Sequence, residues 1–423
     1  MRTEQAVTVR GALTVVVNII IGIGILTLPR EVATKAGPNS VVATLLGAVP
    51  VAVALAALNG LAPWMRRRRL EHGLESLVGR WAARLLLCAY CVYFLLFAAV
   101  IARAFAEVVN ANVLRNTPVE AIMIPMLFAA VYVVHHRTVT LMRAIELTFP
   151  VLVATLVLLA LATMGRANLI YVRPQPALGL GPLLQGLGAS LFAYSGYGVY
   201  LFLLPELEDR PRRHLPWLVA ATVGLIYSMV VFSAVATFGT VEVQRITWPT
   251  IELVKVTQIP GRVLERLESA FLAVWVTAVF TTVAPGLFAA AKALQALLGL
   301  KEHRVLAPVA LPVLYVVALL PPNFAAVARV LTGLGWASLV LEIAVPVLLW
   351  AVATIRGWGR RRAPGRGAGA ASGRRAGCGV AALAGAPSGG PSAAASDPAA
   401  AAGTGTPANA AAPAQAAPTG RGV

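Results

Sequence analysis

The chain has 423 residues and a mean hydropathy of +0.78, and 58% of its residues are hydrophobic whereas only 12% are charged. A soluble protein of ordinary composition carries about 25% charged residues, so this composition excludes a water-soluble globular protein and favours a polytopic helical membrane protein. The net charge of +18 could suggest nucleic-acid binding, but much of it lies in short loops and in the C-terminal segment, where membrane orientation explains it better.

Long uncharged runs recur along the chain, and about 20 apolar residues in a helix suffice to cross the hydrocarbon core of a bilayer. Hydropathy and helix breakers together predict ten membrane spans. Their approximate ranges are 11–35, 40–63, 81–109, 119–135, 138–164, 183–206, 215–239, 262–298, 305–321 and 326–356.

Basic residues are concentrated in alternate loops between these spans, as in the run MRRRRL at 65–70 and the run EDRPRRH at 208–214. Because basic loops face the cytoplasm, the pattern predicts an even number of spans with both termini cytoplasmic. Segment 357–423 is rich in Ala, Gly and Pro and has almost no large apolar residue. We therefore expect a transporter-like membrane domain at 1–356 and a disordered cytoplasmic tail at 357–423.

Two of the predicted spans contain residues that disrupt helices. The first includes NIIIGIGILTLP at 18–29, where two glycines and a proline interrupt an apolar run. The sixth, LLQGLGASLFAYSGYGVYLFLLPEL at 183–207, is interrupted by Ser195, Gly196 and Gly198. Interruptions at matching positions in two halves of a membrane protein are typical of transporters that bind their substrate near the bilayer midplane.

Unwound backbone inside a membrane leaves N–H and C=O groups that a polar ligand can satisfy, and the N-terminus of a half-helix suits a carboxylate. The ligand-binding residues expected on this basis are Gly22, Ile23, Gly24, Ile25, Tyr194, Ser195, Gly196, Tyr197 and Tyr93. The alternative is that the glycines only permit close helix packing and that Tyr93 belongs to the core. If the backbone is unwound around a ligand, alanine at Gly22, Gly24 or Gly196 should weaken binding without lowering stability.

Four stretches carry a resemblance to a known family: IGIGILTLPREVATKAG, FAYSGYGVYLFLLPEL, WPTIELVK and LERLESAFLAVWVTAVF. Over about residues 8–356 the chain resembles the GerAB-type spore germination permeases, the B subunits of nutrient germinant receptors in the amino acid/polyamine/organocation transporter superfamily. The resemblance implies an all-α fold of about ten transmembrane helices in two inverted five-helix repeats, like that of leucine transporters, with helices 1 and 6 discontinuous. It also implies residence in the spore inner membrane and two partners, an A-type membrane subunit and a C-type lipoprotein subunit.

Three further features concern polar residues within the predicted spans. In the leucine-transporter-like fold that the resemblance implies, a hydroxyl pair at the place of Thr281 and Thr282 lines a sodium site, whereas hydroxyls bonded back to their own helix are the alternative. Glu342 is an intramembrane acid without an obvious local partner, and such acids are usually functional. Glu107 follows Arg103 by four residues and should pair with it on one helix.

The sequence shows no catalytic constellation and no metal-binding motif, since the five histidines lie in predicted loops without HExxH or cysteine partners. We therefore expect neither an enzyme nor a cofactor. The predicted function is a receptor subunit that binds a small germinant, commonly an amino acid, within the membrane and triggers spore germination. The alternatives are a proton- or sodium-coupled amino acid transporter and a scaffold that anchors partners without binding a ligand.

Overall fold

The computed structural model describes residues 7–22, 24–66, 68–175, 179–209, 211–257 and 267–362. These residues form helices, and the strand-type pairing among them is a single parallel bridge between Val7 and Leu207. They belong to one compact unit, Met1–Pro364. Residues 363–423 lie outside the described part of the chain, so the disordered tail stays a prediction.

The first predicted span consists of two helices separated by a break. Helix α1, Val9–Ile20, begins after Thr8, whose hydroxyl accepts a hydrogen bond of 3.1 Å from the N–H of Gly11. Helical geometry ends at Ile21, with φ −78° and ψ 46°, and helix α2 covers Gly24–Ala36. The predicted discontinuity is confirmed.

The sixth predicted span is broken over a longer stretch. Helix α8 covers Leu180–Ser190, residues 191–198 form turns, and the helix resumes as α9, Val199–Leu203, followed by a 3-10 turn at Leu204–Glu206. Within the turns, Gly196 has a φ of +104°, a conformation that residues with a Cβ atom rarely adopt. This discontinuity is confirmed as well.

The remaining predicted spans correspond to helices α3 (Ser40–Met65), α5 (Arg80–Asn112), α6 (Val119–Val134), α7 (Thr138–Thr163), α10 (Leu215–Phe238), α13 (Leu267–Leu298), α14 (Leu306–Leu319), α15 (Phe324–Ser338) and α16 (Val345–Arg362). A π-helical turn, Leu339–Ala344, joins α15 to α16, so the tenth span is not the uninterrupted α-helix that its hydropathy suggests. Short helices α4 (Leu70–Val78), α11 (Thr240–Arg245) and α12 (Pro249–Val256) lie in the connections. By length and apolarity, six helical segments of the described chain can cross a membrane, and three shorter apolar helices accompany them.

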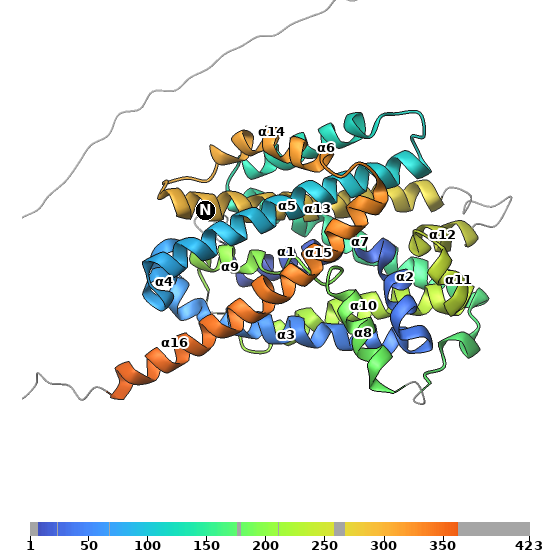
Figure 1. Ribbon diagram of the computed structural model, residues 1–423, viewed down its shortest axis with the longest axis horizontal. Coiled ribbons are helices and arrows are strands. Elements are labelled where there is room, and N and C mark those ends of the chain that lie inside the picture. Colours follow the sequence, from blue (N-terminus) through green and yellow to red (C-terminus); the bar gives the residue numbers. More distant parts are fainter. Residues whose placement is uncertain are drawn as a thin grey trace, which may run out of the picture. The chain divides into compact units, whose positions relative to one another are not determined.

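The helices pack in pairs that relate the two halves of the chain. Helix α5 lies beside α13, and α3 lies beside α10, as Figure 1 shows. These pairs are the third span with the eighth and the second with the seventh, which is the pairing expected when each span packs against its counterpart in the other repeat. In the first and sixth spans, α2 packs against α8 and α1 contacts α9. The two breaks therefore lie next to each other.

Loops rich in arginine come together at one end of the helices, which we call the basic end. Here Arg66 donates a hydrogen bond of 3.0 Å to the carbonyl of Glu208, and His135 contacts the carbonyl of Arg304 at 3.0 Å. At the opposite end, Arg30 donates to the carbonyl of Gln244 at 3.1 Å. The sharing of one end by the basic loops agrees with the predicted alternation, and the cytoplasmic location of that end stays a prediction.

Candidate functional site

The breaks of the first and sixth spans are in direct contact. A Cβ atom on Gly24 would lie 2.7 Å from the Cα of Ala193, and one on Gly196 would lie 3.0 Å from the side chain of Ile19. Glycine permits these approaches because it has no Cβ. The structure thus brings together the residues predicted from the two interrupted spans, apart from Ile23, which lies outside the described residues.

Side chains from other parts of the chain satisfy backbone carbonyl groups at the breaks and at Ile25, whose usual i+4 donor is replaced by Pro29. The hydroxyl of Tyr227 on α10 contacts the carbonyl oxygens of Ile20 and Ala193, at 2.5 and 2.8 Å. The hydroxyl of Thr250 on α12 donates to the carbonyl of Ile25 at 2.8 Å. Sequence reasoning missed both side chains, although a tyrosine within the apolar helix α10 was available as a signal.

Glu342 fills the same role for the N–H groups of the sixth span. Its carboxylate accepts hydrogen bonds from the N–H of Gly196, at 2.8 and 3.1 Å to its two oxygens, and from that of Gly198 at 3.2 Å. The side chain is 0% exposed and comes from the π-helical turn. Such turns often occur at functional sites. The sequence singled out Glu342, but not its partners.

Aromatic rings of α5 form a wall beside these glycines. Tyr93 and Phe94 make an edge-to-face contact with ring centroids 5.0 Å apart, and Phe94 contacts Phe97 at 6.2 Å. A Cβ on Gly198 would lie 3.2 Å from Phe94, and one on Gly196 would lie 3.1 Å from Phe97. Tyr93 therefore belongs to the aromatic wall beside the sixth-span break, which is the region in which the sequence predicted it.

The other predicted residues of the sixth span are tied to the protein itself. The hydroxyl of Tyr194 donates to the carbonyl of Thr44 at 2.6 Å, and that of Ser195 donates to the carbonyl of Phe192 at 2.6 Å. Tyr197 is 2% exposed. Their contact with a ligand stays a prediction.

The threonine pair of α13 lies against the first break. Thr281 and Thr282 both donate to the carbonyl of Ala278, at 2.9 and 3.1 Å, and the Thr282 hydroxyl is also 3.5 Å from the carbonyl oxygen of Asn18. A Cβ on Gly22 would lie 2.2 Å from the Thr282 oxygen. Back-bonding to the helix is present, and the arrangement also gathers the carbonyl and hydroxyl oxygens that a monovalent cation needs. The ion site stays a prediction.

The expectation that alanine at Gly22, Gly24 or Gly196 leaves stability unchanged conflicts with the close contacts and backbone of these glycines. A Cβ at Gly22 or Gly24 would meet atoms closer than 3.0 Å, and Gly196 adopts a positive φ. Close packing requires glycine at Gly22 and Gly24, and the unwound backbone requires it at Gly196. The packing interpretation and the unwound-site interpretation therefore do not exclude each other.

A cavity of about 620 Å³ opens between α2, α8 and α15 at the end opposite the basic end. Its lining includes Arg30, Glu31 and Lys35 of α2, together with Phe192 and Ala193 at the start of the sixth-span break. The cavity thus adjoins the break from one side and carries charges of both signs. Hydropathy gave no indication of it, because its walls come from spans far apart in the chain.

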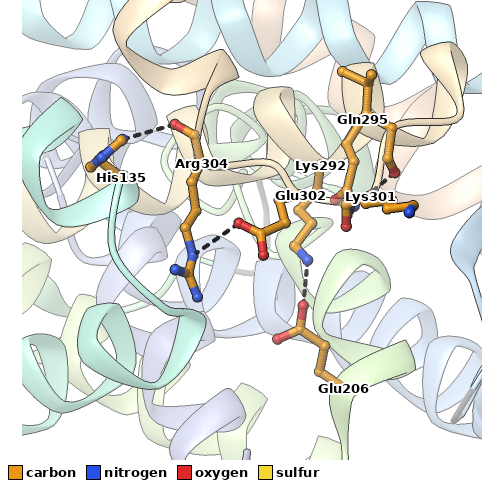
Figure 2. Close-up of polar contacts among 8 residues, drawn as sticks. His135, Glu206, Lys292, Gln295, Lys301, Glu302 and Arg304 are labelled. Carbon is orange, nitrogen blue, oxygen red and sulfur yellow. Dashed lines mark hydrogen bonds and ion pairs between the residues drawn. The ribbon is translucent and has the colours of Figure 1, made fainter.

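A cluster of polar side chains lies at the basic end, and Figure 2 shows their contacts. Lys292 of α13 forms an ion pair with Glu206, at the end of the sixth span, and its ammonium lies 5.6 Å from the ring centroid of Phe288. Arg304 contacts Glu302 at 3.8 Å. Burial, reinforced by the Lys292 charge, lowers the pKa of His303 in the adjoining loop from 6.5 to about 4.

The predicted pairing of Glu107 is confirmed, since this residue forms an ion pair of 2.8 Å with Arg103 on α5.

Among the described residues, no group of three or more His, Cys, Asp or Glu side chains is arranged to hold a metal ion.

Comparison with known families supplies the identification. The spore permease family model, described as spore germination protein, matches residues 6–327. The chain belongs to this family. It is 25% identical to spore germination protein YndE of Bacillus subtilis over 84% of this chain and 98% of that protein. It is also 25% identical to spore germination protein B2 of the same organism, over 84% of this chain and 97% of the relative.

The fold has a solved counterpart in a transporter. The structure of MhsT in complex with L-phenylalanine superposes with a TM-score of 0.60 over 84% of this chain and 90% of that one, at 14% identity. The chain therefore has the leucine-transporter-like fold of two inverted five-helix repeats that the resemblance implied. It is a multi-pass membrane protein of a permease-type family.

Proposed function

We propose that this chain is the B-type subunit of a nutrient germinant receptor, which binds a small germinant where the breaks of the first and sixth spans meet. The observation that carries the proposal is the contact between the two breaks at Gly24 and Ala193, in a chain of the spore germination family. An amino acid is the germinant class that we favour. The ligand enters through the cavity between α2, α8 and α15, which adjoins the sixth-span break.

The receptor role includes partners and a location that follow from the family. We infer an A-type membrane subunit and a C-type lipoprotein subunit as partners, in the spore inner membrane, with both termini cytoplasmic. Relatives named as germination proteins A2 and B2 support membership in such receptors.

A screen of the purified full-length chain in lipid nanodiscs against amino acids, sugars and nucleosides tests ligand binding. We expect at least one compound to raise the melting temperature in a concentration-dependent way, because a ligand that binds only the folded state stabilises it. Absence of any shift across all three classes would contradict the proposal. Co-purification with the A- and C-type subunits tests the receptor role separately.

A coupled amino acid transporter is the second candidate, and the position of Thr282 favours it. Its hydroxyl lies between its own helix and the carbonyl of Asn18, beside the first break, where a coupling sodium ion would join the two spans. Ligand-dependent uptake into proteoliposomes that contain this chain alone, driven by a sodium or proton gradient, would favour the transporter. Binding without uptake would favour the receptor.

A further inference from the structure

Glu342 is a fully buried carboxylate to which no basic side chain is paired within the described chain. Its hydrogen-bond partners are the N–H groups of Gly196 and Gly198. The single N–H of Gly196 is shared between the two carboxylate oxygens, so two backbone donors serve a group that offers about four acceptor positions. Backbone dipoles stabilise a buried carboxylate, but they do not supply the positive charge that most buried acids acquire from a partner.

The surroundings of Glu342 suit an organic cation. The rings of Phe94 and Phe97 approach the two glycines that hold the carboxylate, and aromatic faces attract ammonium groups. The hydroxyl of Tyr93 is a polar neighbour of both Glu342 and Ser195. An acid, an aromatic wall and a phenolic hydroxyl thus converge at one buried point.

Glu342 also excludes the carboxylate of a ligand from the N–H groups of the sixth-span break. The N–H groups of Gly196 and Gly198 are already occupied, so a ligand carboxylate has no free donors at this place in the sixth span. Helix α2 begins at Gly24, and its first N–H groups have no partner within their own helix, so we assign the carboxylate of a ligand to this end.

We propose that Glu342 is the specificity-determining residue that binds the ammonium group of the ligand, so that the site selects compounds with a primary amine. The assignment rests on the proposed function, since it presupposes a ligand between the two breaks. The competing interpretation gives Glu342 a purely structural role as a cap for the sixth-span N–H groups.

The first test uses the wild-type chain in nanodiscs with matched probes. These are L-alanine, L-leucine and L-phenylalanine, their amides, which lack the carboxylate, and propanoate, 4-methylpentanoate and 3-phenylpropanoate, which lack the ammonium. We expect binding of at least one amino acid and of its amide, and no binding of the corresponding acid. Binding of the acids with unchanged affinity would overturn the inference and leave the proposed function intact. If none of the probes binds, the inference also falls, whereas a sugar or nucleoside detected in the broader screen would still support the proposed function.

The second test compares Glu342→Gln with Glu107→Gln, a control at a partly buried glutamate that has its own arginine partner. We expect Glu342→Gln to weaken binding of the amino acid and its amide on the order of tenfold to a hundredfold, and Glu107→Gln to leave that affinity unchanged. A structural cap predicts instead a lower melting temperature for Glu342→Gln with unchanged amine affinity in the folded fraction. Stabilisation of the wild type, but not of Glu342→Gln, by sodium in place of choline would show a metal-ion site and overturn the assignment.

Discussion

The phenolic hydroxyl of Tyr227 lies 2.5 Å from the carbonyl oxygen of Ile20, the last residue of α1. It also lies 2.8 Å from the carbonyl oxygen of Ala193 in the break of the sixth span. A hydroxyl has one hydrogen, so the two carbonyl groups share it. One side chain of α10 therefore links both breaks and stabilises unwound backbone that has no access to water.

Replacing Tyr227 with phenylalanine should destabilise the protein. The substitution keeps the ring and leaves two buried carbonyl oxygens without this donor, which costs about 1 to 3 kcal/mol. Thermal melting of the purified chain should show a lower midpoint than for the wild type.

Tyr132→Phe is the matched control for that experiment, because this tyrosine is 68% exposed. We expect its melting temperature to equal that of the wild type. Equal midpoints for Tyr227→Phe and Tyr132→Phe would mean that the Tyr227 hydroxyl does not stabilise the breaks.

Gly196→Ala should destabilise the fold and abolish the ligand-induced shift. The φ of +104° costs a residue with a Cβ about 1 to 3 kcal/mol, and the added methyl would lie 3.1 Å from Phe97. Gly333→Ala on α15 is the control, since nothing lies within 4 Å of its Cβ position and alanine favours a helix. We expect Gly333→Ala to retain or raise the melting temperature. A fully stable Gly196→Ala protein would contradict the left-handed conformation of this residue.

Local sequence patterns were sufficient to predict the spans and both breaks. Hydropathy shows which segments can cross a membrane as helices, and clusters of glycine weaken a helix wherever they occur. Both signals can be read from one continuous stretch of sequence. The breaks in the first and sixth spans and the pair formed by Arg103 and Glu107 belong to this class.

Contacts between distant segments could not be predicted in this way. Glu342 is 146 residues from Gly196, and no periodicity in either span shows that one side chain reaches the other backbone. The same holds for Tyr227 and Ile20, which are 207 residues apart. The expectation that alanine would not lower stability has the same weakness. Helix propensity describes one segment and takes no account of the distant residue that an added Cβ would contact.

Gly22 and Thr282 should be energetically coupled. A Cβ on Gly22 would lie 2.2 Å from the Thr282 oxygen, so Gly22→Ala should lower the melting temperature by overpacking. Thr282→Ala removes that oxygen. The Cβ of residue 282 would still lie 2.9 Å from the methyl group added at Gly22, so the second substitution relieves only part of the overpacking.

A double-mutant cycle measures this coupling. We expect the double variant to be less destabilised than the sum of the single variants, with an interaction of about 0.5 to 3 kcal/mol. Strict additivity would show that the break of the first span and α13 do not meet at this point. Loss of any sodium dependence of ligand binding in Thr282→Ala would in addition support the predicted ion site.

The last prediction concerns the basic end and acid pH. Burial lowers the pKa of His303 from 6.5 to about 4, and the positive charge of Lys292 acts in the same direction, whereas Glu206 opposes it. The imidazole also packs edge-on against Phe288, with ring centroids 5.3 Å apart. The unfolded chain therefore binds a proton on His303 below about pH 6.5, and the folded chain binds it only near pH 4.

Because the unfolded state takes up the proton first, stability is fully present above pH 6.5 and is lost as the pH falls toward 4. Between pH 7 and pH 5 this one group lowers the free energy of unfolding by about 2 kcal/mol. His303→Gln removes the titrating group, so its melting temperature should fall less than that of the wild type over this interval. His72→Gln is the control, since the side chain of His72 is 67% exposed, and it should follow the wild type. Parallel pH profiles for the wild type and His303→Gln would contradict a buried, neutral His303 and, with it, the packing of this loop against α13.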